Sequence, residues 1–165
     1  MKVYERPIIG WREWIALPQL GIDKLRCKVD TGAKTSALHA FYVEPYEQEG
    51  LTRVKFGLHP DENSTSIEKH CEAVVIDQRN VTDSGGHTEQ RFVIQTNIVL
   101  GERVWPTQIT LTNRDTMKHR MLFGRTAILD YFLIDSSSQH LMGLPGTSPQ
   151  TQVIHPYLHT DEEEE

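Results

Sequence analysis

The stretch KVDTGAKTS occupies residues 28–36, at the end of the apolar-leaning run 22–29. Asp30 offers a carboxylate that can polarise a water molecule, and the hydroxyl of Thr31 can lock a turn. Gly32 lets the backbone bend close to a bound substrate. Residues of these types also form ordinary turns between two strands, so this stretch alone leaves open a reactive turn or a plain one.

A second stretch, Met121-Leu122-Phe123-Gly124-Arg125, lies much further along the chain and leads into the helix-compatible segment 126–129. Together, the two stretches resemble the core of the retropepsin-like family whose members carry the name ATP-dependent zinc protease. Members of that family often accompany ribosomal-protein glutamate ligases. The resemblance implies that the apolar strand passes beside the Asp-Thr-Gly turn, that Gly124 permits a close crossing, and that residues 125–131 form a single short helix.

The resemblance extends over most of residues 10–135. The further segments that fit the family pattern are 11–15, 17–18, 28–40, 104–106 and 111–125. It implies a retropepsin-like domain at 11–135, preceded by an N-terminal arm at 1–10 and followed by a C-terminal extension at 136–165 that carries an acidic tail.

The spacing of Gly, Pro, Asn and Asp along the chain is typical of an all-β domain. The expected strands are 11–16, 24–29, 53–57, 73–79, 89–100, 104–111, 120–123 and 132–134. Residues 44–50 and 59–68 are expected to be surface loops, and 136–152 is rich in Ser, Gly and Pro. With the family resemblance, this pattern predicts a closed six-stranded acid-protease β-barrel with a flap hairpin and one short helix.

The triplet Asp83-Ser84-Gly85 superficially resembles a second active-site turn, as in the two-lobed pepsins. A chain of 165 residues with one apolar-Gly element cannot supply two lobes. We therefore interpret 83–86 as the tip of a hairpin. In the family resemblance this hairpin is the flap, and its glycines would let it open for substrate and then exclude water.

Hydrolysis by an aspartic mechanism needs two carboxylates that share one proton across a bound water. One chain supplies one Asp-Thr-Gly turn. The simplest complete site is a two-fold symmetric homodimer that places Asp30 beside its copy and lets the Thr31 hydroxyls link the two turns. The sequence therefore predicts an aspartic endopeptidase that acts as a homodimer on a peptide or protein.

The residue after Asp-Thr-Gly-Ala is Lys34, where retroviral enzymes carry an acidic residue that can pair with the Arg of the Gly-Arg element. The partner of Arg125 is therefore unassigned, and cations near the turn could favour an acidic substrate. One hypothesis is that Lys34 and Arg125, with Arg91, bind side-chain carboxylates of an oligo-glutamate peptide. The alternative is that Lys34 is solvated and Arg125 is structural.

The candidate site residues fall into three groups by expected role. The catalytic group is Asp30, Thr31 and Gly32. The substrate-binding group is Ala33, Lys34, Asp83, Ser84, Gly85, Gly86, Arg91 and Arg125. The group that supports the site structurally is Phe123 and Gly124.

Composition limits the remaining choices. A chain of 165 residues with 38% hydrophobic and 24% charged residues suits one globular domain. Because no signal-peptide pattern and no long apolar run occur, we expect a cytoplasmic protein without a membrane partner. Five of the 23 acidic residues form the tail 161–165, and the others nearly balance the 17 basic residues. No nucleic-acid partner is expected, because no basic stripe with interleaved aromatic residues is visible.

The family name claims zinc and ATP, yet we expect no cofactor and no metal. The eight histidines show no compact ligand spacing, and the neighbours His70 and Cys71 would point to opposite faces of a strand. Residues 28–36 are not a phosphate loop, because Lys28 and Ala33 stand where its two glycines are required. Any ATP dependence would therefore belong to a neighbouring ATP-grasp glutamate ligase. Two alternatives stay open: a zinc-dependent peptidase, as the family name says, and a catalytically silent β-barrel that binds a partner.

Overall fold

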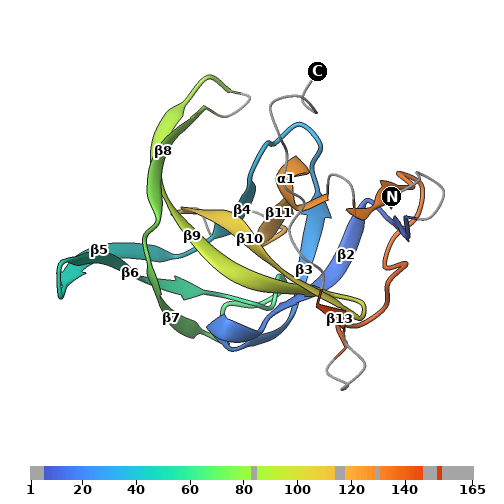
Figure 1. The fold of residues 1–165 in the computed structure, drawn as a ribbon, viewed down its shortest axis with the longest axis horizontal. Coiled ribbons are helices and arrows are strands. Elements are labelled where there is room, and N and C mark those ends of the chain that lie inside the picture. Colours follow the sequence, from blue (N-terminus) through green and yellow to red (C-terminus); the bar gives the residue numbers. More distant parts are fainter. Residues whose placement is uncertain (1–5, 83–84, 114–117, 129–130, 147–151, 154–165) are drawn as a thin grey trace.

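The computed structural model describes residues 6–82, 85–113, 118–128, 131–146 and 152–153. In this part of the chain nearly all regular elements are strands (Figure 1), and α1 (Arg125–Ile128) is the α-helix among them. A 3-10 turn, η2 (Pro18–Leu20), joins the first two long strands. The predicted all-β class with one short helix is confirmed, and the helix begins at Arg125 as predicted.

The central sheet closes into a ring of strands. Neighbours pair in the order β10, β4, β11, β3, β2 and β9, and β9 pairs back to β10. The bounds are β2 (Arg12–Leu17), β3 (Ile22–Val29), β4 (Ser36–His39), β9 (Thr88–Leu100), β10 (Arg103–Thr112) and β11 (Met121–Phe123). Buried side chains from these strands, among them Ile15, Leu25, Ile94, Trp105 and Phe123, belong to one apolar cluster.

Strand β3 shows why one face of the sheet is buried and the other is exposed to solvent. From Lys24 to Val29 its residues alternate between basic and apolar. Leu25 and Cys27 are buried, whereas Lys24 and Lys28 are exposed. Because neighbouring residues on a strand point to opposite faces, one face of β3 packs into the core and the other is positively charged.

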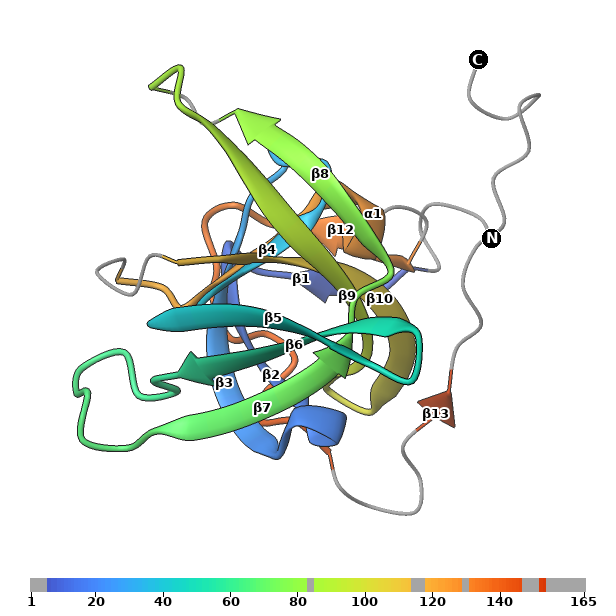
Figure 2. The same ribbon diagram turned by 90° about the vertical axis from the view of Figure 1, so that its left-hand side faces the viewer.

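A separate three-stranded sheet consists of β5 (Tyr42–Gln48), β6 (Leu51–Leu58) and β7 (Lys69–Val74), with β6 in the middle. It faces the viewer in Figure 2, below the hairpin of β8 (Asp77–Thr82) and β9. The expectation of a loop at 44–50 is wrong for the residues of β5. Pro45 and the exposed Glu44 and Glu47 are tolerated in a strand here because β5 lies at the edge of its sheet.

The predicted single strand 73–79 is also wrong, because the chain changes sheets in the middle of it. β7 ends at Val74, and β8 (Asp77–Thr82) pairs with β9. Between them, the N–H of Val75 donates to Thr52 of the three-stranded sheet, and the N–H of Ile76 donates to Val93 of the ring. The segment 73–79, which the sequence pattern predicts to be one strand, therefore links two sheets.

The terminal segments are bound to the ring through a buried carboxylate. Glu13 is fully buried, and its side chain accepts hydrogen bonds from the N–H groups of Gly10, Leu141 and Met142 at 2.8 to 3.0 Å. Three short strands complete the termini: β1 (Ile8–Ile9), β12 (Leu133–Ile134), which pairs with β1, and β13 (Gln152–Val153), which pairs with β10. Over the described residues, no helix has the length and apolar character required to cross a membrane.

Candidate active site

The Asp30 turn, residues 30–33, begins where β3 ends. The N–H of Asp30 donates to the carbonyl oxygen of Phe123 at 2.9 Å, and the N–H of Ala33 donates to the carbonyl oxygen of Asp30 at 3.3 Å. The N–H of Gly32 donates to Oδ1 of Asp30 at 2.9 Å. The half-buried Asp30 carboxylate is thus oriented by its own turn, with Thr31 and Gly32 exposed beside it. A carboxylate in this position can bind water and accept its proton.

The strand β11 passes beside this turn and then crosses the chain that leaves it. Phe123 lies opposite Val29 in a parallel pair. A Cβ on Gly124 would lie 2.6 Å from the carbonyl carbon of Thr35 and 2.8 Å from the backbone nitrogen of Ser36. The N–H of Gly124 donates to Oγ of Ser36 at 3.0 Å. Residue 124 must therefore be glycine for the two chain segments to approach this closely.

Arg125 binds the Asp30 turn through its backbone and its side chain. Its Nη1 donates to the carbonyl oxygen of Thr31 at 2.8 Å, and its N–H donates to the carbonyl oxygen of Ala33 at 2.9 Å. The N–H of Thr126 donates to the carbonyl oxygen of Lys34 at 3.0 Å. The start of α1 therefore holds the turn, and Arg125 contacts a backbone carbonyl rather than the side chain at residue 34. This geometry favours the structural alternative for Arg125.

A pocket of about 550 Å³ opens next to the Asp30 turn. One side is formed by the residues after the turn and by α1, and the other by the β8–β9 hairpin and β10. The lining residues are Lys34, Thr35, Thr126, Tyr131, Arg79, Gln95, Trp105, Pro106, Thr107 and Gln108. Lys34 and Arg79 give this pocket positive charge from two sides, and amide side chains add hydrogen-bonding capacity.

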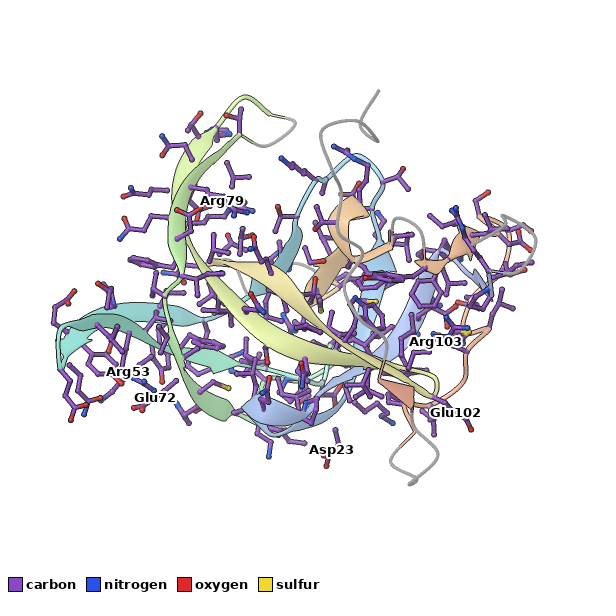
Figure 3. The ribbon with its side chains drawn as sticks, viewed as in Figure 1. Asp23, Arg53, Glu72, Arg79, Glu102 and Arg103 are labelled. Carbon is purple, nitrogen blue, oxygen red and sulfur yellow. The ribbon has the colours of Figure 1, made fainter. Side chains whose placement is uncertain are left out.

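Arg79 is a pocket residue that sequence reasoning missed. It lies on β8, on the side of the hairpin that faces β10 (Figure 3), and its Nη2 donates to Oε1 of Gln108 at 2.8 Å. Its Nε donates to Oδ2 of Asp77 at 2.8 Å, and this hydrogen bond is the main cause that lowers the pKa of Asp77. The guanidinium is thus held over the pocket from two directions. No local motif marks Arg79, and the strand register was needed to place it.

Among the other expected substrate-binding residues, Arg91, Gly85 and Gly86 lie on the same hairpin but do not line the pocket, and neither do Ala33 and Arg125. Arg91 is opposite Arg79 in the pairing of β8 and β9, and its Nε is 3.4 Å from a carboxylate oxygen of Glu89. Residues 85–86 are exposed near the end of the hairpin, and Gly86 has a φ of 85°, which favours glycine. Asp83 and Ser84 lie outside the described residues.

The described residues do not supply an evident metal centre. No three side chains from His, Cys, Asp and Glu gather there in a way that could hold a metal ion. Burial raises the pKa of the Cys27 thiol to about 12 and that of Cys71 to about 11. Both thiols therefore stay protonated at neutral pH, and neither is prepared to act as a nucleophile.

Comparison with known proteins gives a family and several relatives. A family model described as RimB-like, retropepsin-like aspartic endopeptidase RimB, matches residues 8–143. Proteins named probable alpha-L-glutamate ligase are similar: those of Shewanella pealeana and Shewanella halifaxensis are 45% and 46% identical over 139 and 136 residues. The matched region covers 84% and 82% of this chain but 30% of each ligase. The chain thus spans about a third of the length of these curated relatives.

A solved structure is also similar. It is the crystal structure of a Legionella pneumophila protein of unknown function, with a TM-score of 0.68 and 26% sequence identity. The similarity covers 82% of this chain and 98% of that one.

Proposed function

The chain belongs to the RimB-like family of retropepsin-like aspartic endopeptidases, and from this membership we propose that it hydrolyses peptide bonds with Asp30 as its catalytic carboxylate. The observation that carries the proposal is the Asp30 turn, whose carboxylate is oriented by the N–H of Gly32 and whose backbone is held by Phe123 and Arg125. In this proposal the ring of strands is the closed barrel of the aspartic peptidases.

The proposed enzyme is a homodimer. The ionised carboxylate of one Asp30 accepts a proton from water, and the water oxygen attacks the carbonyl carbon of the peptide bond. The protonated carboxyl of the other Asp30 donates its proton to the carbonyl oxygen, and the carbon–nitrogen bond breaks after a proton reaches the leaving nitrogen. Thr31 is exposed at the turn, which is the position needed to contact its copy across a two-fold axis.

The proposed substrate is an acidic, glutamate-rich peptide. Lys34 and Arg79 place two positive charges on the pocket beside the Asp30 turn, and fixed cations in a cleft attract carboxylates and raise their rate of capture. Relatives with the name glutamate ligase point to the same chemistry. Arg125 contacts Thr31 and does not line the pocket, whereas Lys34 and Arg79 do. We therefore assign the role of binding side-chain carboxylates to Lys34 and Arg79. The β8–β9 hairpin would close over such a peptide as a flap.

A second candidate is a domain that binds glutamate-rich peptide without cutting it. The observation that favours it is that the matched region is 30% of the length of proteins named as ligases, which could use it to hold a substrate. The zinc-dependent peptidase, which the name ATP-dependent zinc protease suggests, has no such support, because no set of metal ligands occurs among the described residues.

Mass spectrometry of peptide cleavage tests the proposal. Wild-type and Asp30→Asn protein are incubated with oligo-α-glutamate and with a neutral peptide, each with and without a chelator. We expect chelator-resistant cutting of the glutamate peptide that disappears in Asp30→Asn. The isosteric change keeps the hydrogen bond from Gly32, so the fold should be retained, which circular dichroism checks.

The other outcomes are informative as well. Binding of the glutamate peptide by a verified dimer without any cutting would favour the second candidate. Chelator-sensitive cutting that survives Asp30→Asn would reject Asp30 as the catalytic group. A monomer at the concentration used for activity, measured by sedimentation, would reject the dimeric mechanism.

A further inference from the structure

The outward face of β2 and β3 gathers positive charge from residues that are separate in the sequence. Arg12 lies opposite Lys28 and Trp14 lies opposite Arg26 in the antiparallel pair. Residues directly opposite in such a pair share a face. We call the surface formed by Arg12, Lys24, Arg26 and Lys28 the basic face. None of these four residues lines the pocket at Lys34, so the two surfaces are distinct.

Burial and the positive charges of the basic face lower the pKa values of two nearby histidines. The pKa of His119 is lowered to about 4, first by burial and then by the charges of Arg12, Arg26, Lys118 and Lys28. The pKa of His140 is lowered by burial and by Arg26 and Arg12. Arg12 and Arg26 thus act on both histidines, and this part of the basic face disfavours additional positive charge.

One glutamate of the protein already lies on this surface. Glu62, in the loop between β6 and β7, forms an ion pair with Arg26, and the two side chains are 8% and 17% exposed. Both residues line a pocket of about 480 Å³ together with Trp14 and Lys24. The site at Arg26 thus accepts a glutamate carboxylate. Lys24, Lys28 and Arg12 form no ion pair with an acidic residue in the described part of the chain.

The spacing of the cations matches an extended acidic peptide. Lys24, Arg26 and Lys28 are alternate residues of one strand, so they are about 7 Å apart, which is also the spacing of alternate side chains in an extended peptide. The row ends two residues before Asp30. A peptide that follows it would therefore arrive at the Asp30 turn.

We propose that the basic face is a binding track for an extended, glutamate-rich peptide that leads to Asp30, with Glu62 in the place of one substrate glutamate. The track deepens the proposed function, and it rests on that function for its direction toward Asp30. An acidic peptide fits better than a nucleic acid, because the tryptophan rings are already engaged. His140 stacks on Trp14 at a centroid distance of 5.5 Å, and Arg12 lies 4.6 Å from the ring centroid of Trp11.

Fluorescence anisotropy with a labelled oligo-α-glutamate of about ten residues tests the track. The Asp30→Asn background prevents cutting, so binding is measured apart from hydrolysis. The double change Lys24→Gln, Lys28→Gln should weaken binding at least about threefold, and Glu62→Gln should strengthen it by freeing Arg26. The double change Lys55→Gln, Lys69→Gln is the matched control, because it also removes two exposed strand lysines. Lys55 lies 5.2 Å from the ring centroid of Tyr46, as Lys24 lies 4.9 Å from that of Trp14.

The track is wrong if the Lys24→Gln, Lys28→Gln variant loses no more affinity than the Lys55→Gln, Lys69→Gln control. It is also wrong if Glu62→Gln weakens binding while its melting temperature is unchanged. A labelled uridine oligonucleotide serves as the competing probe. Tighter binding of this RNA than of the peptide, lost in the Lys24→Gln, Lys28→Gln variant, would overturn the assignment to an acidic peptide. Binding to the track without hydrolysis by wild type would uphold the track and reject the catalytic proposal, so the two failures are separable.

Discussion

The guanidinium of Arg125 donates a hydrogen bond of 2.8 Å to the carbonyl oxygen of Thr31, joining residues that are 94 positions apart in the sequence. The bond fixes the exposed part of the Asp30 turn to the start of α1. A side chain that contacts a backbone carbonyl holds the turn regardless of which side chain occupies position 34. This explains how Lys34 is accommodated where retroviral enzymes have an acidic residue.

Replacing Arg125 should therefore loosen the turn. Arg125→Ala is expected to lower the free energy of unfolding by about 1 kcal/mol, because one charge-assisted hydrogen bond at an exposed site is lost. Peptide cleavage should fall more than this stability change explains, since the Asp30 carboxylate loses its support. Chemical denaturation and cleavage rates measured below the unfolding transition check the two effects. Unchanged cleavage in Arg125→Ala would contradict the role of Arg125 as a positioning residue.

Gly124→Ala should be strongly destabilising. Its Cβ would lie 2.6 Å from a backbone atom of Thr35, and overpacking against backbone costs about 1–3 kcal/mol or more. Gly21→Ala is the control, because Gly21 has a φ of 73° but nothing within 4 Å of an added Cβ, so about 1 kcal/mol is expected from the backbone alone. Urea midpoints compare the two variants. Equal losses would show that β11 and the chain at Thr35 can separate without cost.

Glu13→Ala should release the C-terminal segment. It leaves the N–H groups of Gly10, Leu141 and Met142 without their acceptor, and buried unsatisfied donors cost about 1–3 kcal/mol each, not additively. We expect a loss of several kcal/mol and faster hydrogen exchange at residues 141 and 142. Glu13→Gln, which keeps one acceptor oxygen, should retain part of the stability. Unaltered exchange at both residues would rule out this carboxylate as their anchor.

The lowered pKa of His119 predicts a pH dependence of stability. The unfolded chain binds a proton near pH 6.5, whereas the folded protein does so only near pH 4. Below pH 6.5 the unfolded state therefore binds more protons than the folded state. The free energy of unfolding decreases as the pH is lowered from 6.5 to about 4. Because His119 is only partly buried, we expect about 1 kcal/mol from this residue. Urea denaturation across that window should show a smaller fall in His119→Gln, and an identical fall would refute this origin.

Charge at the pocket should set the preference for acidic peptides. Arg79→Gln and Lys34→Gln are each expected to raise KM for an oligo-glutamate peptide by about two- to tenfold, because one carboxylate partner is lost. The change in kcat should be smaller, and cleavage of a neutral peptide should stay as in wild type. Steady-state kinetics with both peptides distinguish these effects. Lys55→Gln, remote from the pocket, serves as the charge control.

Much of the ring could be predicted because its strands carry the two-residue alternation that a half-buried strand requires. In β3, Leu25 and Cys27 alternate with Lys24 and Arg26, and the pattern is decided by local sequence. The edge strand β5 could not be predicted, since Pro45 and its acidic neighbours favour a loop in isolation. Its strand conformation comes from pairing with β6, which is a tertiary effect.

The candidate site divides in the same way. The Asp30 turn is a local motif of the printed sequence, whereas the Gly124 crossing was predicted from the resemblance to the retropepsin-like family. Arg79 depends on the strand register. The basic face is partly visible in the sequence, because Lys24, Arg26 and Lys28 alternate along β3, but Arg12 joins them only because β2 pairs with β3 and places Arg12 opposite Lys28.

The change of sheet between β7 and β8 fixes the start of the β8–β9 hairpin. Val75 is bonded to Thr52 and Ile76 to Val93, so the first residues of the hairpin are clamped between two sheets. If the hairpin closes over a peptide as proposed, its bending is confined to the residues beyond Ile76, and these include Arg79 on β8. In that proposal a substrate carboxylate that binds the guanidinium of Arg79 would compete with Gln108, whose Oε1 accepts a hydrogen bond from it.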